Sequence, residues 1–135
     1  ILFCRPKIVD ITKKKVVLYI PLNRQTRNHV KSMYIGTMTV GADLVTGLTA
    51  MLSIRRSKRK IILIFKDLNA TFLKRAEGDT YFTCHSVEGI ESAVHEVISS
   101  KDRVNINVPV IATVPDKFGE ESVAEFTITL SMKEY

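Results

Sequence analysis

The stretch NHVKSMYIGTMTVGADLVTG, residues 28–47, combines residue types that could do chemistry with the spacing of a helix. Gly36 and Asp43 are seven residues apart, which places them two turns apart on nearly the same helix face. That face also carries Thr39, Val40, Gly47 and Ala50. Small residues let a ligand or another backbone approach, and a carboxylate there could act as a base or a nucleophile. The alternative is that the glycines only let the helix lie tightly against a sheet, with Asp43 hydrogen-bonded to a neighbour.

The first half of the chain supplies the elements that must position this helix. Residues 8–20 predict a strand, with alternating apolar side chains and three lysines where a bend or exposed edge would be. The helix itself is expected from about residue 33 to residue 54. Five consecutive large apolar residues at 61–65 predict a strand covered on both faces. Residues 79–86 predict another strand, with Tyr81 and Phe82 on opposite faces.

The second half predicts one shorter helix and two long strands. Residues 87–100 have helical spacing, and acidic residues lie in the first turn, where the helix dipole favours them. Residues 103–114 and 122–133 alternate as strands do, and Pro109 indicates an edge or a bulge. The connections between strands are too short for parallel crossovers, so we expect a mostly antiparallel sheet. The fold class is α+β, in one domain spanning residues 1–135.

The spacing around Gly36 resembles a known family signature. NHVKSMYIG, followed seven residues later by Asp, resembles the motif of hotdog-fold acyl-CoA thioesterases of the phenylacetate-pathway type. That motif is N-x-x-G-x-x-H-G-G followed seven residues later by Asp or Glu, and Asn28, Gly36 and Asp43 match it. FLKRAEGD and ESVAEFTITL also resemble family segments, the strand and turn after the helix and the last strand. The resemblance therefore extends over nearly the whole chain.

Three positions depart from that signature. Lys31 stands where the family usually has glycine, Tyr34 where it has histidine, and Ile35 where it has the first glycine. The chain is thus most similar to an uncharacterised branch in which SMYxG replaces His-Gly-Gly. The polarising histidine is missing, and whether the Tyr34 hydroxyl replaces it is left open.

The resemblance implies a hotdog fold, in which a mostly antiparallel sheet wraps a long central helix, and a thioester hydrolase. The Gly36 amide would stabilise the oxyanion, Asp43 would act as general base or nucleophile, and Asn28 would hold the loop or contact water. Subunits of such proteins pair, so Asp43 would face Gly36 of the partner subunit in a homodimer or dimer of dimers. The substrate would be an acyl-CoA or acyl-carrier thioester, with no cofactor. The alternative, favoured by the missing histidine, is a non-catalytic acyl-CoA-binding or regulatory protein.

Two basic segments are further candidates for binding. Residues 55–60, RRSKRK, could contact nucleic acid or the phosphates of coenzyme A, or form a solvated loop that complements the helix end. The run has no interleaved aromatic residues, so nucleic acid is disfavoured. Lys74 and Arg75 precede a glycine-containing turn and could meet a pantetheine arm or a diphosphate, or simply be exposed charges.

Composition restricts which classes of protein and which cellular compartments remain possible. Residues 1–60 carry 13 Lys and Arg against 2 acids, and residues 61–135 carry 7 against 12, which indicates a basic face. Cys4 and Cys84, the only cysteines, are interpreted as reduced thiols, so we expect a cytoplasmic protein. No uninterrupted apolar run approaches the roughly 18 residues of a membrane span, and no signal sequence is visible, although the chain starts at Ile1.

Histidines and cysteines provide no obvious alternative site. His29, His85 and His95 lack the spacing of metal ligands, so no metal is expected. Cys84 and His85 are neighbours on a predicted strand and would point to opposite faces, which disfavours a thiol–imidazole pair.

Overall fold

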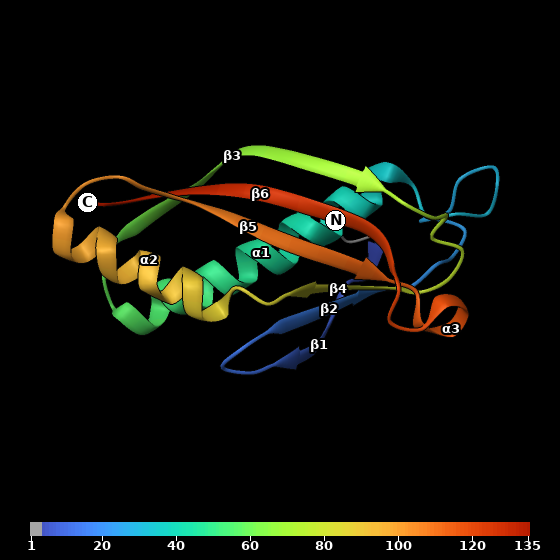
Figure 1. The fold of residues 1–135 in the computed structure, drawn as a ribbon, viewed down its shortest axis with the longest axis horizontal. Coiled ribbons are helices and arrows are strands. Elements are labelled where there is room, and N and C mark those ends of the chain that lie inside the picture. Colours follow the sequence, from blue (N-terminus) through green and yellow to red (C-terminus); the bar gives the residue numbers. More distant parts are fainter. Residues whose placement is uncertain (1–3) are drawn as a thin grey trace.

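A six-stranded antiparallel sheet wraps around one long helix in the computed structural model, which describes residues 4–135 (Figure 1). The strand order is β1-β2-β4-β5-β6-β3. The strands are β1 (Lys7–Ile11), β2 (Val16–Ile20), β3 (Ile61–Phe72), β4 (Thr80–Cys84), β5 (Val104–Thr113) and β6 (Ser122–Glu134), and the helices are α1 (Ile35–Ser57), α2 (Val87–Ser100) and α3 (Pro115–Phe118). The predicted α+β class and the hotdog arrangement are confirmed, as is the helix at residues 87–100.

Helix α1 begins two residues later than predicted and ends three residues later. Met33 lies outside it because its N–H donates to the Ala76 carbonyl at 2.9 Å. At the other end Arg55 and Arg56 occupy the last turn, where the helix dipole favours cations, so part of the basic segment is helix rather than loop. Lys58 then ends the helix in a left-handed conformation, with φ of 58°.

Among the glycines of α1, Gly41 lies nearest to the sheet. A Cβ built on Gly41 would lie 2.4 Å from the Phe82 ring of β4, which is fully buried. Gly36 has nothing within 4 Å of such a Cβ, and Gly47 only an ordinary contact at 3.4 Å from Phe65. Gly41, which residue spacing did not single out, therefore allows the helix to sit tightly on β4.

Strand β3 is an exposed edge of the sheet. It pairs only with β6, and Ile62, Ile64 and Phe65 are 52%, 48% and 44% exposed. The prediction that residues 61–65 are covered on both faces is therefore wrong for the single chain. An apolar run has the same composition whether its cover comes from its own chain or from another one.

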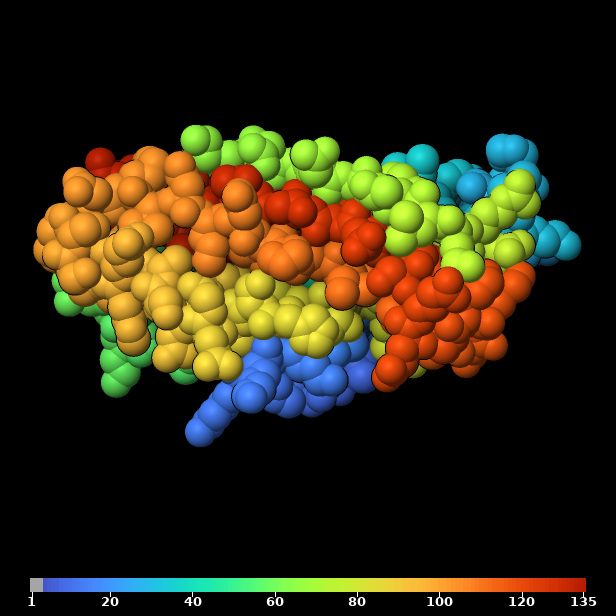
Figure 2. Space-filling view, in the orientation of Figure 1, coloured from blue at the N-terminus to red at the C-terminus, as the bar shows by residue number. Residues whose placement is uncertain are grey.

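Residues 8–20 form a hairpin instead of one strand. β1 and β2 pair antiparallel, and the lysines at 13–15 lie in the turn, where the Thr12 hydroxyl accepts hydrogen bonds from the N–H groups of Lys14 and Lys15. The bend predicted at the lysines is thus confirmed. Figure 2 shows the hairpin projecting from the body of the molecule.

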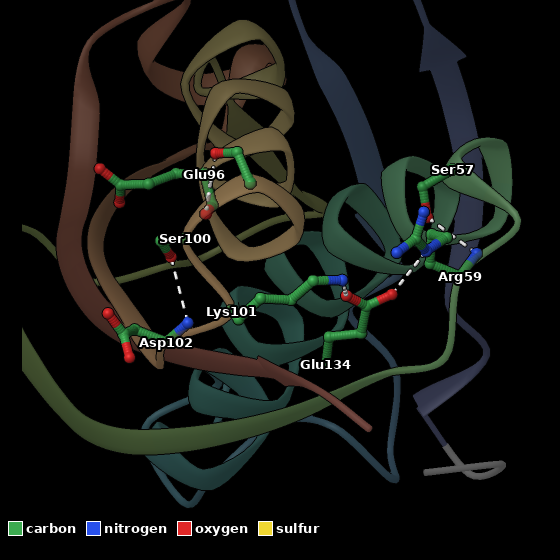
Figure 3. A network of polar contacts seen from close by, with 8 residues as sticks. Ser57, Arg59, Glu96, Ser100, Lys101, Asp102 and Glu134 are labelled. Atoms are coloured by element: carbon green, nitrogen blue, oxygen red, sulfur yellow. Dashed lines mark hydrogen bonds and ion pairs between the residues drawn. The ribbon is translucent and has the colours of Figure 1, made fainter.

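Ion pairs tie the end of α1 and the end of α2 to the last strand. Glu134 lies between Arg59 and Lys101 and bonds both, with 3.0 Å between its Oε1 and the Lys101 Nζ (Figure 3). The hydrogen bonds from Arg59 and Lys101 hold the pKa of Glu134 below its usual range. Arg56 also lies 3.9 Å from Glu91 Oε2, so two cations of the basic segment are already engaged within the protein.

Helix α1 is also long and apolar enough, by length and composition, to cross a membrane. The expectation that no segment approaches a membrane span, which was based on uninterrupted apolar runs, is corrected for α1. Met38, Ala42 and Val45 on α1 are buried among side chains of the sheet, and the central helix of a wrapped sheet meets the same criterion.

Candidate functional site

Predicted site residues line two hollows next to α1, one at its start and one along its middle. The helix-start cavity, of about 420 Å³, is lined by Asn28, Val30, Ser32, Met33, Ile35, Met38, Phe72, Leu73, Lys74, Arg75 and Ala76. The Asp43 groove, of about 290 Å³, is lined by Thr39, Asp43, Phe65, Lys66, Asp67, Leu68 and Ile128. The predicted site residues divide between these two places.

The start of α1 presents free backbone donors. Tyr34 is the N-cap residue and its carbonyl accepts from the Met38 N–H at 2.9 Å, but no side chain caps the helix. The N–H groups of the first turn, Gly36 among them, have no acceptor within the helix. Gly36 is exposed and its surroundings are open. Together with the positive end of the dipole, these donors could stabilise a developing negative charge.

Asn28 holds the loop that leads into the helix. Its Oδ1 accepts from the Val30 N–H at 3.0 Å and the Ser32 N–H at 3.1 Å, and its own N–H donates to the Ser32 carbonyl at 2.6 Å. These bonds tie the loop together around Asn28. Lys31 adopts a φ of 59° in this loop, in the left-handed region that glycine adopts most easily.

Lys74 and Arg75 lie beside Asn28, as lining residues of the helix-start cavity. The Lys74 Nζ is 3.1 Å from Glu121 Oε1 and 5.1 Å from the centre of the Phe118 ring. Arg75 is exposed. The cavity therefore has an apolar interior with cationic side chains along one side.

Asp43 is half-buried in its groove, between α1 and β3. Burial raises the pKa of its carboxyl group, and among the described residues no hydrogen bond or neighbouring charge counteracts this shift. The alternative in which Asp43 is hydrogen-bonded to a neighbour is therefore wrong. A carboxylate without a partner, in a largely apolar groove, is suited to accept a proton.

One chain does not bring Asp43 and Gly36 together. Seven residues along a helix correspond to about 10 Å, too far for both groups to act on one carbonyl. Tyr34 is 48% exposed and lines neither hollow. The structure thus groups Asn28 with Lys74 and Arg75, and leaves Gly36, Tyr34 and Asp43 apart.

A bulge in β3 shapes the floor of the Asp43 groove, which residue spacing did not reveal. Phe65 pairs with Leu130 and Asp67 with Thr129, so Lys66 is the extra residue. Leu68 pairs with Ile128 and shares the inward face with Phe65, although strict alternation would separate them. The Asp67 side chain instead accepts from the Thr129 hydroxyl at 2.6 Å. Only the register could reveal this arrangement.

Ser32 is a second lining residue that neither type nor spacing singled out. It is 4% exposed and borders the helix-start cavity. A serine in a loop is ordinarily a surface residue, so the sequence offered no signal for its burial.

The other titratable side chains do not assemble a site. Cys84 is buried, which raises its pKa, and His85 is exposed, so their predicted opposite orientation is confirmed. Within residues 4–135 no group of three or more His, Cys, Asp or Glu side chains could hold a metal ion.

Solved structures of other proteins share this fold. A protein of unknown function from Chlorobaculum tepidum TLS superimposes with a TM-score of 0.85 at 12% identity, covering 99% of this chain and 85% of that one. A probable thioesterase from Pseudomonas aeruginosa does so with a TM-score of 0.78 at 20% identity, covering 98% and 85%. A thioesterase from Haemophilus influenzae gives 0.71 at 9% identity, covering 98% and 81%. At these identities the likeness shows the fold.

Sequence comparison identifies the family. No curated protein matches the chain. The model of a family described as a domain of unknown function, DUF4442, matches residues 3–132. The chain therefore belongs to the DUF4442 family.

Proposed function

We propose that this protein hydrolyses an acyl thioester of coenzyme A or of a carrier protein, at a site formed between two subunits. The observation that carries the proposal is Asp43, a half-buried carboxylate without a partner beside an exposed strand edge. Similar folds in proteins described as thioesterases support the reaction class.

A homodimer would complete the site. The free edge of β3 has unpaired backbone groups, and apolar side chains along it are exposed, including Ile62, Phe65 and Phe72. A second copy paired along this edge would cover those side chains and close the Asp43 groove. It would also bring Gly36 of the partner subunit towards Asp43, which the spacing within one helix forbids. The same surfaces could support a dimer of dimers.

The chemistry would proceed by addition and elimination. Asp43 takes a proton from water as the water oxygen attacks the thioester carbon, and the carbonyl oxygen gains negative charge beside the Gly36 amide. The C–S bond then breaks, and the thiolate leaves and is protonated, so the products are a carboxylic acid and a thiol. Asp43 could instead attack the carbonyl carbon itself; the C–S bond then breaks, the thiolate leaves and is protonated, and water hydrolyses the resulting anhydride to the carboxylic acid and free Asp43.

Substrate binding would use the helix-start cavity. Lys74 and Arg75 can attract the phosphates of a coenzyme A or a phosphopantetheine group. Asn28 holds the loop, and Tyr34 is a candidate for the role of the absent histidine if a second subunit covers it. Two buried free thiols, Cys4 and Cys84, support a reducing compartment such as the cytoplasm.

The decisive experiment compares wild type with Asp43→Ala on a panel of acyl-CoA thioesters. We expect turnover to be lost while binding of an unreactive S-alkyl-CoA thioether persists. Asp67→Ala is the matched control, because that carboxylate also lines the groove, from β3, but accepts a hydrogen bond from the Thr129 hydroxyl. Unchanged turnover in Asp43→Ala would exclude this carboxylate as the base.

Mixed dimers test whether the site crosses subunits. Asp43→Ala and Gly36→Pro, which removes the amide N–H, should each be inactive alone. Random re-pairing should restore roughly one quarter of wild-type turnover, because half of the dimers regain one complete site. No recovery, with mixed dimers verified by mass, would place both groups in one chain.

A non-catalytic acyl-CoA-binding protein is the second candidate. It is favoured by the exposed Tyr34 at the position of the family's histidine. Acyl-CoA binding with no turnover by the wild-type dimer would support this alternative.

A further inference from the structure

Ser32 carries the one buried side-chain oxygen or nitrogen that lacks a hydrogen-bond partner within residues 4–135. The residue is 4% exposed, so bulk water does not satisfy its hydroxyl. Buried hydroxyl groups are almost always hydrogen-bonded, and an exception points to a partner from outside the chain, such as a ligand or a water molecule. The space that Ser32 borders is the helix-start cavity.

The backbone of Ser32 is held in place on both sides. Its N–H donates to Asn28 Oδ1 at 3.1 Å and its carbonyl accepts from the Asn28 N–H at 2.6 Å. The next residue, Met33, is fixed by its bond to the Ala76 carbonyl at 2.9 Å. The hydroxyl is therefore the remaining polar group of a rigidly held residue, ready to bind without reorganisation.

The polar groups near Ser32 match an amide. A hydroxyl can donate one hydrogen bond and accept others, and the two N–H groups of the Asn28 side chain are donors, because its Oδ1 already accepts twice. An amide presents one N–H and one carbonyl oxygen, so this pair of side chains can satisfy both. Most of the other lining residues are apolar, among them Val30, Met38 and Phe72, which suits the aliphatic parts of an amide-linked chain.

We propose that Ser32 Oγ hydrogen-bonds an amide of a pantetheine arm bound in the helix-start cavity. The inference rests on the proposed function for the identity of the ligand, but it does not require that the thioester is hydrolysed. The arm would run from phosphates near Lys74 and Arg75, past Ser32, towards the free amides at the start of α1. Ser32 is then a specificity residue that distinguishes pantetheine thioesters from simple ones.

The test uses two probes that no thioesterase can hydrolyse. One is S-hexyl pantetheine, a thioether with the natural amides, and the other is an S-hexyl thioether of equal length in which ether links replace the amides. Calorimetry measures the binding of both to wild type, Ser32→Ala, Ser32→Cys and the control Ser131→Ala. Ser131 is also a buried serine, but its hydroxyl accepts from Arg103 at 3.0 Å.

We expect Ser32→Ala to weaken binding of the amide probe by about fivefold to tenfold and to leave the ether probe unchanged. Ser32→Cys should lose affinity in the same direction, because a thiol is a weaker donor. The Tm of Ser32→Ala should not fall, since no bond within the protein is lost, whereas that of Ser131→Ala should fall with both affinities unchanged.

Three results would overturn the inference: no binding of either probe, equal weakening of both, or an unchanged amide affinity in Ser32→Ala. Failure of the proposed function gives a different pattern. Wild type would then bind the amide probe through Ser32 but hydrolyse no acyl pantetheine.

Discussion

Glycine residues have different surroundings on the two sides of α1: one side is tightly packed against the sheet and the other is not. On the side facing β4, Gly41 lies against the Phe82 ring and leaves no space for a side chain. On the side facing β3, Asp43 borders a groove that Phe65 also lines, and a Cβ built on Gly47 would only make an ordinary contact with the Phe65 ring. The first side holds the helix in the sheet and the second leaves room for a ligand. A glycine in a helix therefore has to be judged by what its missing Cβ would meet.

The largest expected effect is a difference in stability between two matched variants, Gly41→Ala and Gly47→Ala. Gly41→Ala should lower the free energy of unfolding by about 1–3 kcal/mol, because the added methyl overlaps the Phe82 ring. Gly47→Ala should raise it by about 0.5–1 kcal/mol, because alanine favours the helix and the contact at 3.4 Å is tolerable. Urea denaturation of both variants measures the difference. Equal effects would show that the two sides are packed alike.

The next effect concerns the length of the acyl chain. The Phe65 ring lines the Asp43 groove, and a groove volume of about 290 Å³ suits a short or medium acyl chain. Phe65→Ala should raise the kcat/KM ratio of dodecanoyl-CoA to hexanoyl-CoA by roughly tenfold. Ile64→Ala is the control, because Ile64 is exposed on the neighbouring position of the same strand and lines neither hollow. An unchanged ratio in Phe65→Ala would remove the ring as the limit on chain length.

The smallest effect is the influence of pH on stability through Asp43. Burial raises the pKa of Asp43 in the folded protein, so the fold favours the neutral carboxyl group and loses stability as pH rises through that pKa. Asp43→Asn, which is always neutral, should therefore be more stable than wild type at neutral pH. The gain should disappear below the pKa that an aspartate has in an unfolded chain. Thermal melts across this range check the sign, and a loss of stability in Asp43→Asn at neutral pH would contradict it.

Periodicity made much of the fold predictable from the sequence. The predicted helix at residues 87–100 and the predicted strands near the C-terminus are confirmed. Each of them buries one face, so apolar residues recur in its sequence at a regular spacing. The prediction that residues 61–65 are covered on both faces is wrong because an apolar run does not show whether its own chain covers it. The pattern of residues 8–20 predicts one strand instead of a hairpin, because the turn is formed by Thr12 and lysines and not by glycine or proline.

The candidate site was predictable only where chemistry and spacing coincide. Asp43 was identifiable because a carboxylate on a helix of small and apolar residues is unusual. Ser32 and the bulge at Lys66 were not, because burial of a loop serine and a shift of strand register both depend on distant contacts. Local sequence does not record such contacts.

The left-handed backbone at Lys31 determines what a substitution by glycine would change. A lysine held at a φ of 59° strains the loop by about 1–2 kcal/mol, which a glycine would relieve. Glycine would also remove an exposed positive charge next to two residues that line the helix-start cavity. Replacement of Lys31 by glycine would thus exchange attraction of anionic substrates for a less strained backbone.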